Sequence, residues 1–145
     1  MTTASKLKIT KLSKNARIPI RHSEGAAGYD ISALEEGIIN PKEVVEIKTG
    51  LVFHIPKGHM GVIFGRSGLA LMNGLEPLNS KVLPDSNNEL IVKILNNSED
   101  VFKYEAGMRI AQLVIIETCN YELEEVDKLE DSTRGTSGFG STGLH

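Results

Sequence analysis

The sequence has a single cysteine, Cys119, so no disulfide bond can form within the chain, and a reducing compartment is expected. Long hydrophobic runs are also absent, because the longest, residues 113–116, is far too short to span a bilayer. Residues 1–8 contain no apolar stretch of the kind found in a signal peptide. We therefore expect a cytoplasmic or nuclear protein without a membrane partner.

Several classes of site have no support in the sequence. The formal net charge of −3 and the isoelectric point near 5.8 argue against a direct nucleic-acid surface as the main function. No GxxxxGK[ST] motif occurs, which excludes a P-loop. The four histidines, at positions 22, 54, 59 and 145, do not show the spacing of metal ligands, so a zinc site is not expected.

What the sequence does contain is a series of short β-type segments. A length of 145 residues fits one domain with a hydrophobic core. Stretches rich in β-branched and aromatic residues are separated by turn residues such as those of NNSED at 96–100. This pattern predicts an all-β fold of the sandwich or barrel type, with one brief helix at 67–74 that ends at Gly74. The predicted strands are residues 43–49, 51–55, 60–64, 89–95, 101–104 and 108–116.

The C-terminal segment, residues 131–145, is rich in glycine and has few residues that could build a core. Composition alone predicts a flexible terminus. The same segment also has features of a ligand-binding arm. Glycine lets backbone amides approach an anion closely, arginine binds phosphate, and a phenyl ring can stack on a base.

Four segments, AAGYDISA (26–33), RSGLA (66–70), GMRIAQL (107–113) and RGTSGFGSTG (134–143), together resemble the homotrimeric dUTPase family in order and spacing. The resemblance implies a distorted β-barrel or jelly roll that assembles as a trimer with sites shared between subunits. Residues 1–130 would form the β domain, and residues 131–145 an arm that closes over a neighbouring subunit's site. The family reaction converts dUTP and water to dUMP and pyrophosphate, with Mg²⁺ bound mainly through the triphosphate.

The resemblance also assigns roles to individual residues, and their chemistry fits those roles. Arg66 offers a planar set of donors for phosphate oxygens, and Gln112 lies in an apolar strand where its amide needs a partner. Asp30 matches an acidic residue near the magnesium–water shell, although a structural role as an acceptor for nearby amides fits it equally well. The remaining nucleotide-binding positions are Ser67 and Gly68 and, in the arm, Arg134, Phe139, Gly140, Ser141 and Thr142.

The 80–90 segment, SKVLPDSNNEL, departs from the family pattern, in which a β-hairpin is expected. Aligned without a gap, Leu83 takes the position of the water-activating aspartate, and Ser86 that of the tyrosine beneath the deoxyribose. Leucine cannot orient or deprotonate water, and serine leaves space under the sugar. A gap of two residues in the preceding loop would instead bring Asp85 to the position of the base.

Two functional hypotheses follow from these registers. The first is a dUTPase-family homotrimer that binds dUTP or a related nucleotide with Mg²⁺ but hydrolyses it poorly or not at all, and has a regulatory role, alone or mixed with an active paralogue. The alternative is a working dUTP diphosphatase with an atypical 80–90 segment, which limits uracil in DNA. A third, weaker hypothesis is a structural protein that no longer binds nucleotide. The arm residues argue against it.

Overall fold

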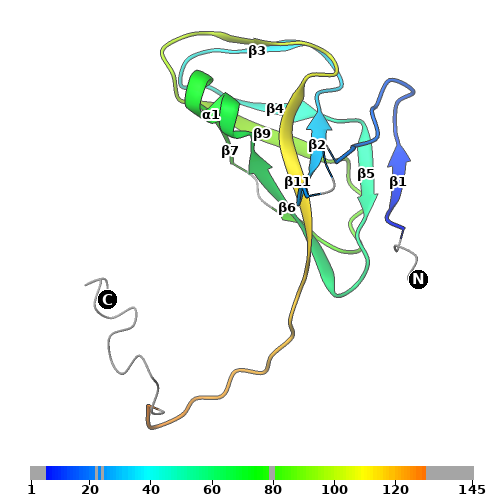
Figure 1. Ribbon diagram of the computed structural model, residues 1–145, viewed down its shortest axis with the longest axis vertical. Helices are drawn as coiled ribbons and strands as arrows, with labels where there is room; N and C mark the ends of the chain where they lie inside the picture. The colour runs from blue at the N-terminus through cyan, green and yellow to red at the C-terminus, as the bar shows by residue number, and fades with distance from the viewer. Residues whose placement is uncertain (1–5, 22, 24, 79–80, 130–145) are drawn as a thin grey trace.

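The computed structural model describes residues 6–21, 23, 25–78 and 81–129 (Figure 1). It contains one short helix, α1 (Ser67–Asn73), among many short strands, which confirms the expected all-β fold. None of the described helices is long and apolar enough to cross a membrane. The strands are β1 (Lys8–Lys11), β2 (Tyr29–Ser32), β3 (Gly37–Ile39), β4 (Val44–Lys48), β5 (Leu51–His54), β6 (His59–Gly65), β7 (Leu75–Pro77), β8 (Lys81–Val82), β9 (Ile91–Asn96), β10 (Phe102–Tyr104) and β11 (Arg109–Glu117).

Within the described residues, the strands form four small antiparallel sheets. The largest has the order β2-β11-β6-β8, and a second has the order β4-β9-β7. Two pairs, β1-β5 and β10-β3, complete the set. Alternate residues of β6 and β11 point inward, as the period of two in a strand requires, so that Ile63 and Leu113 are buried.

The core lies between the two larger sheets. Ile31 and Leu113 from the four-stranded sheet belong to the same buried cluster as Val92 and Ile94 from the three-stranded sheet. These are β-branched or leucine side chains that pack well on a pleated surface. The core therefore fixes β6 and β11, and the outward-facing residues of those two strands lie on a rigid support.

The 80–90 segment lies at the turn end of an antiparallel strand pair, as a hairpin requires, because β7 before it pairs with β9 after it. In the part of the chain that the structure describes, β8 pairs with β6, whereas β9 pairs with β4 and β7. Residues 83–90 therefore link two sheets. The pairing continues toward the turn, where the Leu78 backbone nitrogen donates to the Lys93 backbone oxygen at 2.8 Å, so the two strands of the hairpin are β7 and β9.

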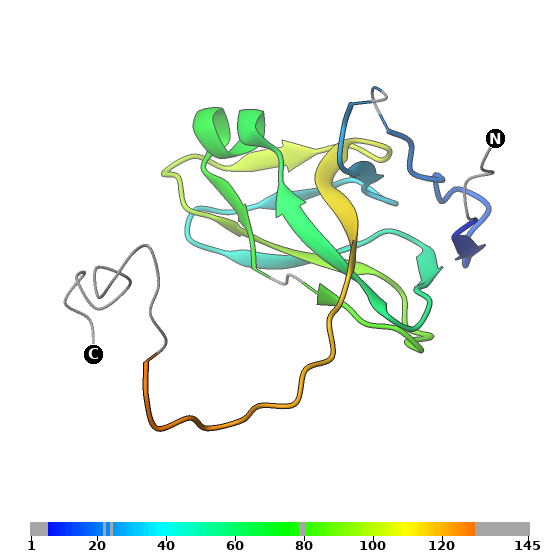
Figure 2. The ribbon, with the colours of Figure 1, turned by 60° about the horizontal axis from the view of Figure 1, so that its bottom comes forward.

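After β11 the chain leaves the body of the protein. Figure 1 and Figure 2, two views that differ by a rotation, both show residues 118–129 extending away from the sheets. Their large hydrophobic side chains are strongly exposed, with Tyr121 at 79%, Leu123 at 98% and Leu129 at 88%. These side chains therefore do not pack in the hydrophobic core of the same chain.

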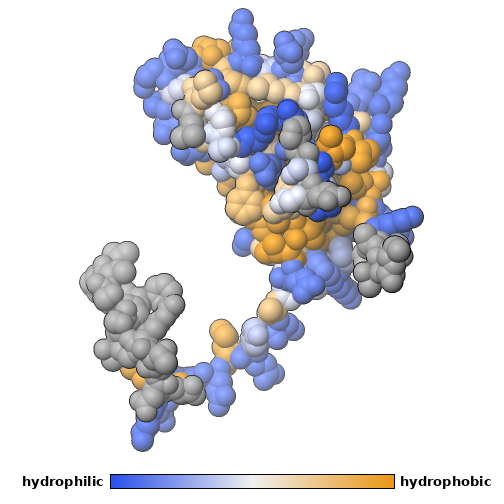
Figure 3. All heavy atoms as spheres, in the orientation of Figure 1, coloured by the Kyte–Doolittle hydropathy of each residue, from blue (hydrophilic) through white to orange (hydrophobic). Residues whose placement is uncertain are grey.

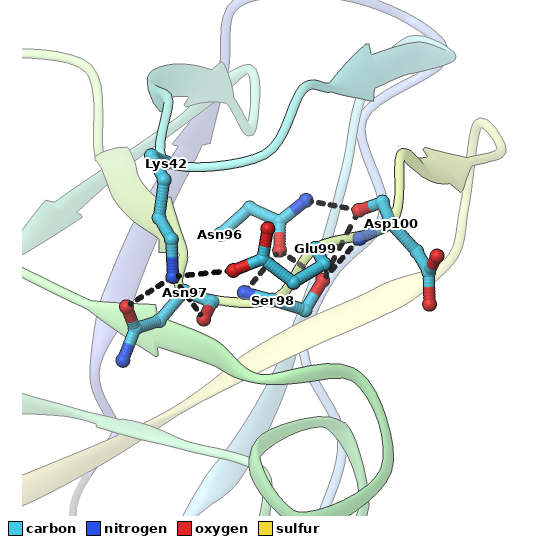
Figure 4. Close-up of polar contacts among 6 residues, drawn as sticks. All are labelled: Lys42, Asn96, Asn97, Ser98, Glu99 and Asp100. Atoms are coloured by element: carbon cyan, nitrogen blue, oxygen red, sulfur yellow. Dashed lines mark hydrogen bonds and ion pairs between the residues drawn. The ribbon is translucent and has the colours of Figure 1, made fainter.

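Asn96, at the end of β9, is a fully buried polar residue whose hydrogen bonds are all satisfied (Figure 4). Its side-chain nitrogen donates to the carbonyl oxygens of Ile39 at 2.9 Å and Asp100 at 2.8 Å. Its side-chain oxygen accepts from the backbone nitrogen and the hydroxyl of Ser98, at 3.0 and 2.7 Å. The side chain thus fixes the turn between β9 and β10.

Replacing Asn96 with alanine is expected to lower the free energy of unfolding by about 2–4 kcal/mol, because buried carbonyl groups would lose their donor. Chemical denaturation followed by circular dichroism measures the change. The matched control is Asn97→Ala at the exposed neighbouring position, where a change within about 0.5 kcal/mol is expected. Equal effects at the two positions would contradict the role assigned to Asn96.

Candidate functional site

Three outward-facing residues form a row across the four-stranded sheet. In the strand register, Asp30 of β2 lies opposite Gln112 of β11, and Gln112 lies opposite Phe64 of β6. Residues directly opposite one another on antiparallel strands share a face of the sheet. Arg66 follows two residues after Phe64, between the end of β6 and the start of α1. The fold therefore gathers Asp30, Arg66 and Gln112, three residues from separate sequence motifs.

Arg109 connects two members of this group. A guanidinium nitrogen of Arg66 donates to the backbone oxygen of Arg109 at 3.2 Å. The Arg109 guanidinium in turn donates to a carboxylate oxygen of Asp30 at 3.3 Å, where the Asp30 side chain is only 11% exposed. Two guanidiniums and one carboxylate leave this cluster with a net positive charge, which suits phosphate oxygens. No role for Arg109 was expected from the sequence, since its link to Asp30 depends on the cross-strand register.

Gly28 explains part of the sequence motif around Asp30. A side chain at this buried position would bring a Cβ atom to 3.0 Å from the amide oxygen of Gln112 and 3.2 Å from its Cβ. Any larger residue would therefore push against the Gln112 side chain. Gly28 was not among the expected site residues, although a glycine directly before a strand can mark the close approach of a neighbouring group.

Ser67 and Gly68 begin α1 directly after Arg66 and are exposed. A Cβ atom added at Gly68 would meet no heavy atom within 4 Å. The surface beside the Arg66 backbone is thus open to a ligand. The neighbouring position 65 is occupied by glycine because an added Cβ would lie 2.9 Å from the Pro77 ring.

The 80–90 segment presents Leu83 and Asp85 to solvent. Leu83 is 55% exposed, a high value for a leucine side chain. Asp85 has a φ of 62°, a left-handed backbone that few residues other than glycine, asparagine and aspartate adopt. The other carboxylate of the segment, Glu89, accepts a hydrogen bond from the Gly50 backbone nitrogen at 2.8 Å.

Asp85 is the available carboxylate of this segment. Within the described residues its side chain makes no hydrogen bond or ion pair, in contrast to that of Glu89. It lines a cavity of about 230 Å³ together with His54 and Ile55. The His54 ring nitrogen Nε2 is 2.7 Å from the Thr10 hydroxyl, which holds the imidazole beside this cavity. An unengaged carboxylate at a cavity can orient water.

Within one chain, the 80–90 segment does not contact the cluster formed by Asp30, Arg66 and Gln112 through any hydrogen bond or ion pair of the described residues. In the part of the chain that the structure describes, no hydrogen bond or ion pair links residues 83–86 with Arg66, Gln112 or Asp30. Leu83 lines a different cavity, whereas Ser86 lines both that cavity and the one beside Asp85. The expected arm residues, Arg134, Phe139, Gly140, Ser141 and Thr142, lie outside the described residues.

The donors available for a metal ion are few. Among the described residues, no group of three or more His, Cys, Asp or Glu side chains is arranged to hold an ion. Asp30 pairs with Arg109, so its expected contact with magnesium through water stays a prediction. Magnesium typically uses one or two carboxylates together with substrate phosphates, and this donor set fits an ion that arrives with a triphosphate.

The comparison with family models matches residues 14–143 to dUTPase. The chain belongs to the dUTPase family. It is 44% identical over 142 residues to the deoxyuridine 5'-triphosphate nucleotidohydrolase of Encephalitozoon cuniculi (strain GB-M1), covering 98% of this chain and 99% of that protein. It is 45% identical over 139 residues to the protein of the same name from Picosynechococcus sp., covering 94% and 98%.

Solved dUTPase structures share the fold. The dUTPase of Staphylococcus bacteriophage 80alpha with dUpNHpp superposes with a TM-score of 0.84 at 32% identity, covering 97% of this chain and all of that one. A mutant dUTPase from phage phi11 of S. aureus, described for its coordination of a structural Mg(II) ion, has a TM-score of 0.80 at 27% identity over 88% of this chain. The expected dUTPase-like barrel or jelly roll is thereby confirmed.

Proposed function

We propose that the chain is a working dUTP nucleotidohydrolase that converts dUTP and water to dUMP and pyrophosphate. The observation that carries this proposal is the cluster of Arg66, Arg109, Asp30 and Gln112 on one face of the sheet of a dUTPase-family chain. Relatives of nearly equal length bear the name of this activity, and the phage relative holds the dUTP analogue dUpNHpp. The sequence left open whether the chain is a working enzyme or a form with impaired hydrolysis. Both findings favour the working enzyme.

In the proposed reaction the phosphates lie against Arg66, Gln112 and the exposed start of α1. Hydrolysis of a phosphoanhydride depends on positioning and charge stabilisation, which guanidinium groups supply. Asp85 orients the attacking water and accepts its proton, because it is the unengaged carboxylate of the 80–90 segment. Magnesium, when bound with the triphosphate, would neutralise phosphate charge, and Asp30 is the nearby carboxylate that could contact its water shell.

The proposed assembly is a homotrimer, and the outer face of the four-stranded sheet supports it. Three cross-strand pairs line this face, namely Met60–Ile116, Val62–Val114 and Phe64–Gln112. Phe64 is 51% and Ile116 is 39% exposed. Figure 3 shows hydrophobic surface gathered where the C-terminal segment leaves the body. An apolar surface beside polar site residues is typical of a subunit interface.

The projecting segment is a second support for assembly between copies. Residues 117–129 contain five acidic residues and one lysine, and Tyr121 and Leu123 alternate with Glu122 and Glu124. The opposite charge is concentrated at the other end of the chain, where no acidic residue accompanies Lys6, Lys8, Lys11, Lys14, Arg17 and Arg21. The acidic segment of one copy is thus complementary in charge to β1, an edge strand, of another. A shared assembly would let the 80–90 segment of one subunit meet the phosphate groups of its neighbour.

One observation favours a second candidate function, binding without turnover. Leu83 stands at the position of the water-activating aspartate in the ungapped register, and its exposed aliphatic side chain cannot act as a base. In this candidate, the family member binds dUTP with magnesium and regulates another process.

Pyrophosphate release from dUTP and Mg²⁺ by the purified full-length protein tests the two candidates. The proposal predicts a turnover of about 1–10³ s⁻¹. Arg66→Ala is expected to lower kcat/KM by about 100-fold or more, whereas Lys103→Ala, which removes an exposed cation from β10, should not change it. Tight binding of dUpNHpp without turnover would support the second candidate, and absence of both would exclude the two.

A further inference from the structure

A cavity of about 480 Å³ lies where β2 and the start of β11 meet the N-terminal segment, and its size falls in the range of small-molecule sites. Its polar side chains are Arg17, Asp30, Ser32 and Arg109. Gly107 and two exposed isoleucines, at positions 18 and 20, form the rest of its wall. This cavity, named the Arg17 cavity below, therefore brings two guanidinium groups together beside an apolar surface.

Arg17 is held in place by the residues around it. The preceding residue, Ala16, belongs to the hydrophobic core and is only 4% exposed. The Arg17 guanidinium lies against Gly107, where an added Cβ atom would overlap it. Gly107 is itself fixed, because its backbone nitrogen donates to the Ala33 backbone oxygen at 2.7 Å. Glycine at position 107, with a φ of 83°, thus leaves the space that the guanidinium occupies.

Two donors of the Arg17 cavity have no protein partner. Within the described residues, neither the Arg17 guanidinium nor the Ser32 hydroxyl makes a hydrogen bond or an ion pair. Arg109 differs, because its guanidinium pairs with the Asp30 carboxylate at 3.3 Å. This distance exceeds the 2.7–2.9 Å or so of a strong charge-assisted hydrogen bond. Two guanidiniums and one carboxylate leave the cavity with a net positive charge.

We infer that the Arg17 cavity is an anion site that takes a small phosphate-class oxyanion, with Arg17 as its main contact. The planar guanidinium of Arg17 offers paired donors to two oxygens of the anion, and the Ser32 hydroxyl donates to another. Arg109 contributes a second positive charge, which also offsets the Asp30 carboxylate on the same wall. The apolar wall lowers the local dielectric and strengthens these contacts.

This site is separate from the phosphate contacts of the proposed function. Arg66, Gln112 and the start of α1, which we propose hold the nucleotide's phosphates, do not line the Arg17 cavity. The two regions meet only at Arg109, whose backbone oxygen accepts a hydrogen bond from Arg66 at 3.2 Å. An anion in the Arg17 cavity would therefore lie beside the candidate site without occupying it.

Calorimetric titration of the full-length protein with inorganic pyrophosphate, in the absence of nucleotide, tests this inference. It is carried out on the wild type and on Arg66→Ala, which lacks a phosphate contact of the proposed function, and binding is expected in both. In the Arg66→Ala background, adding Arg17→Ala is expected to weaken binding by at least about tenfold, because a charge-assisted contact is lost. Adding Arg17→Lys instead should cost less, since lysine keeps the charge without the planar set of donors.

The matched control is Arg21→Ala in the same background. It removes the same side chain and the same charge from the same segment. The Arg21 guanidinium lies 5.9 Å from the centre of the Tyr29 ring, and Arg21 does not line the Arg17 cavity. Affinity for pyrophosphate is expected to stay within about twofold. Equal losses at positions 17 and 21 would show an effect of overall charge and would overturn the site.

The outcomes separate this inference from the proposed function. If Arg66→Ala abolishes pyrophosphate binding and Arg17→Ala in the wild-type background has no effect, the anion binds only at the contacts of the proposed function, and the inference fails alone. Absence of binding to the wild type also overturns the inference, while turnover of dUTP still decides the proposed function. Binding that persists in Arg66→Ala and is lost with Arg17→Ala supports the site, whether or not the protein hydrolyses dUTP.

Discussion

Replacing Asp85 with asparagine is expected to lower kcat for dUTP hydrolysis by about 10²–10⁴-fold, the usual loss when a general base is removed. Asparagine has nearly the same shape as aspartate and tolerates the left-handed backbone of this position, where φ is 62°. The folded structure should therefore survive the substitution. Steady-state pyrophosphate release gives kcat, and titration with dUpNHpp should show affinity within a few-fold of wild type.

Asp100→Asn is the matched control for this prediction. Asp100 is exposed in the turn between β9 and β10, and its backbone, not its carboxylate, makes the hydrogen bonds with Asn96 and Ser98. The same loss of one carboxylate there should leave kcat unchanged. Wild-type turnover by Asp85→Asn would show that water is activated from elsewhere.

Much of the fold was predictable because strand formation leaves a local pattern in the sequence. Residues 60–64 and 108–116 alternate or cluster β-branched residues, and the structure places β6 and β11 there. The predicted helix at 67–74 is α1, and Gly74 ends it with a φ of 65°. Shorter strands such as β3 and β8 were missed, since two or three residues carry too little periodicity to distinguish a strand from a turn.

The candidate site was predictable only in part, for a related reason. Arg66 and Gln112 stand in recognisable motifs, but the contact of Arg66 with the Arg109 backbone depends on how β6 and β11 align. The pairing of Arg109 with Asp30 likewise depends on the register of β2 and β11, which is interrupted by a bulge between Arg109 and Ala111. Sequence patterns identify the residue types, whereas sheet register decides which of them meet.

The 80–90 segment is a further case in which the sequence alone does not determine the spatial arrangement of the site. Counting positions cannot decide whether Leu83 or Asp85 faces the attacking water, because a two-residue shift carries no local signature. The structure adds that Asp85 has an unusual backbone and an unengaged carboxylate, while Leu83 is exposed. These observations favour Asp85, and a rescue experiment can separate the two positions.

In the Asp85→Asn background, adding Leu83→Asp together with Ser86→Tyr should raise kcat by about 100-fold or more if the ungapped register holds in this chain, and should leave it unchanged if Asp85 alone faces the water. The new aspartate restores a carboxylate at the position that the ungapped register assigns to the base, and the tyrosine restores the ring beneath the sugar. Leu83→Asn with Ser86→Tyr in the same background is the control, since it has the same shape without a base. Pyrophosphate release measures both.

Comparing kcat across the single and combined variants then identifies the general base. When two residues can perform the same task, the losses of kcat in their single variants do not add in the combined variant. If position 83 can supply the base, the cost of Asp85→Asn should shrink from about 10²–10⁴-fold in the wild type to a few-fold in the Leu83→Asp, Ser86→Tyr background. If the triple variant is as slow as Asp85→Asn alone, position 83 does not face the attacking water. Asp85 would then be the residue that activates water, because of the path that the segment takes between β8 and β9. The ungapped family register would not apply to this chain.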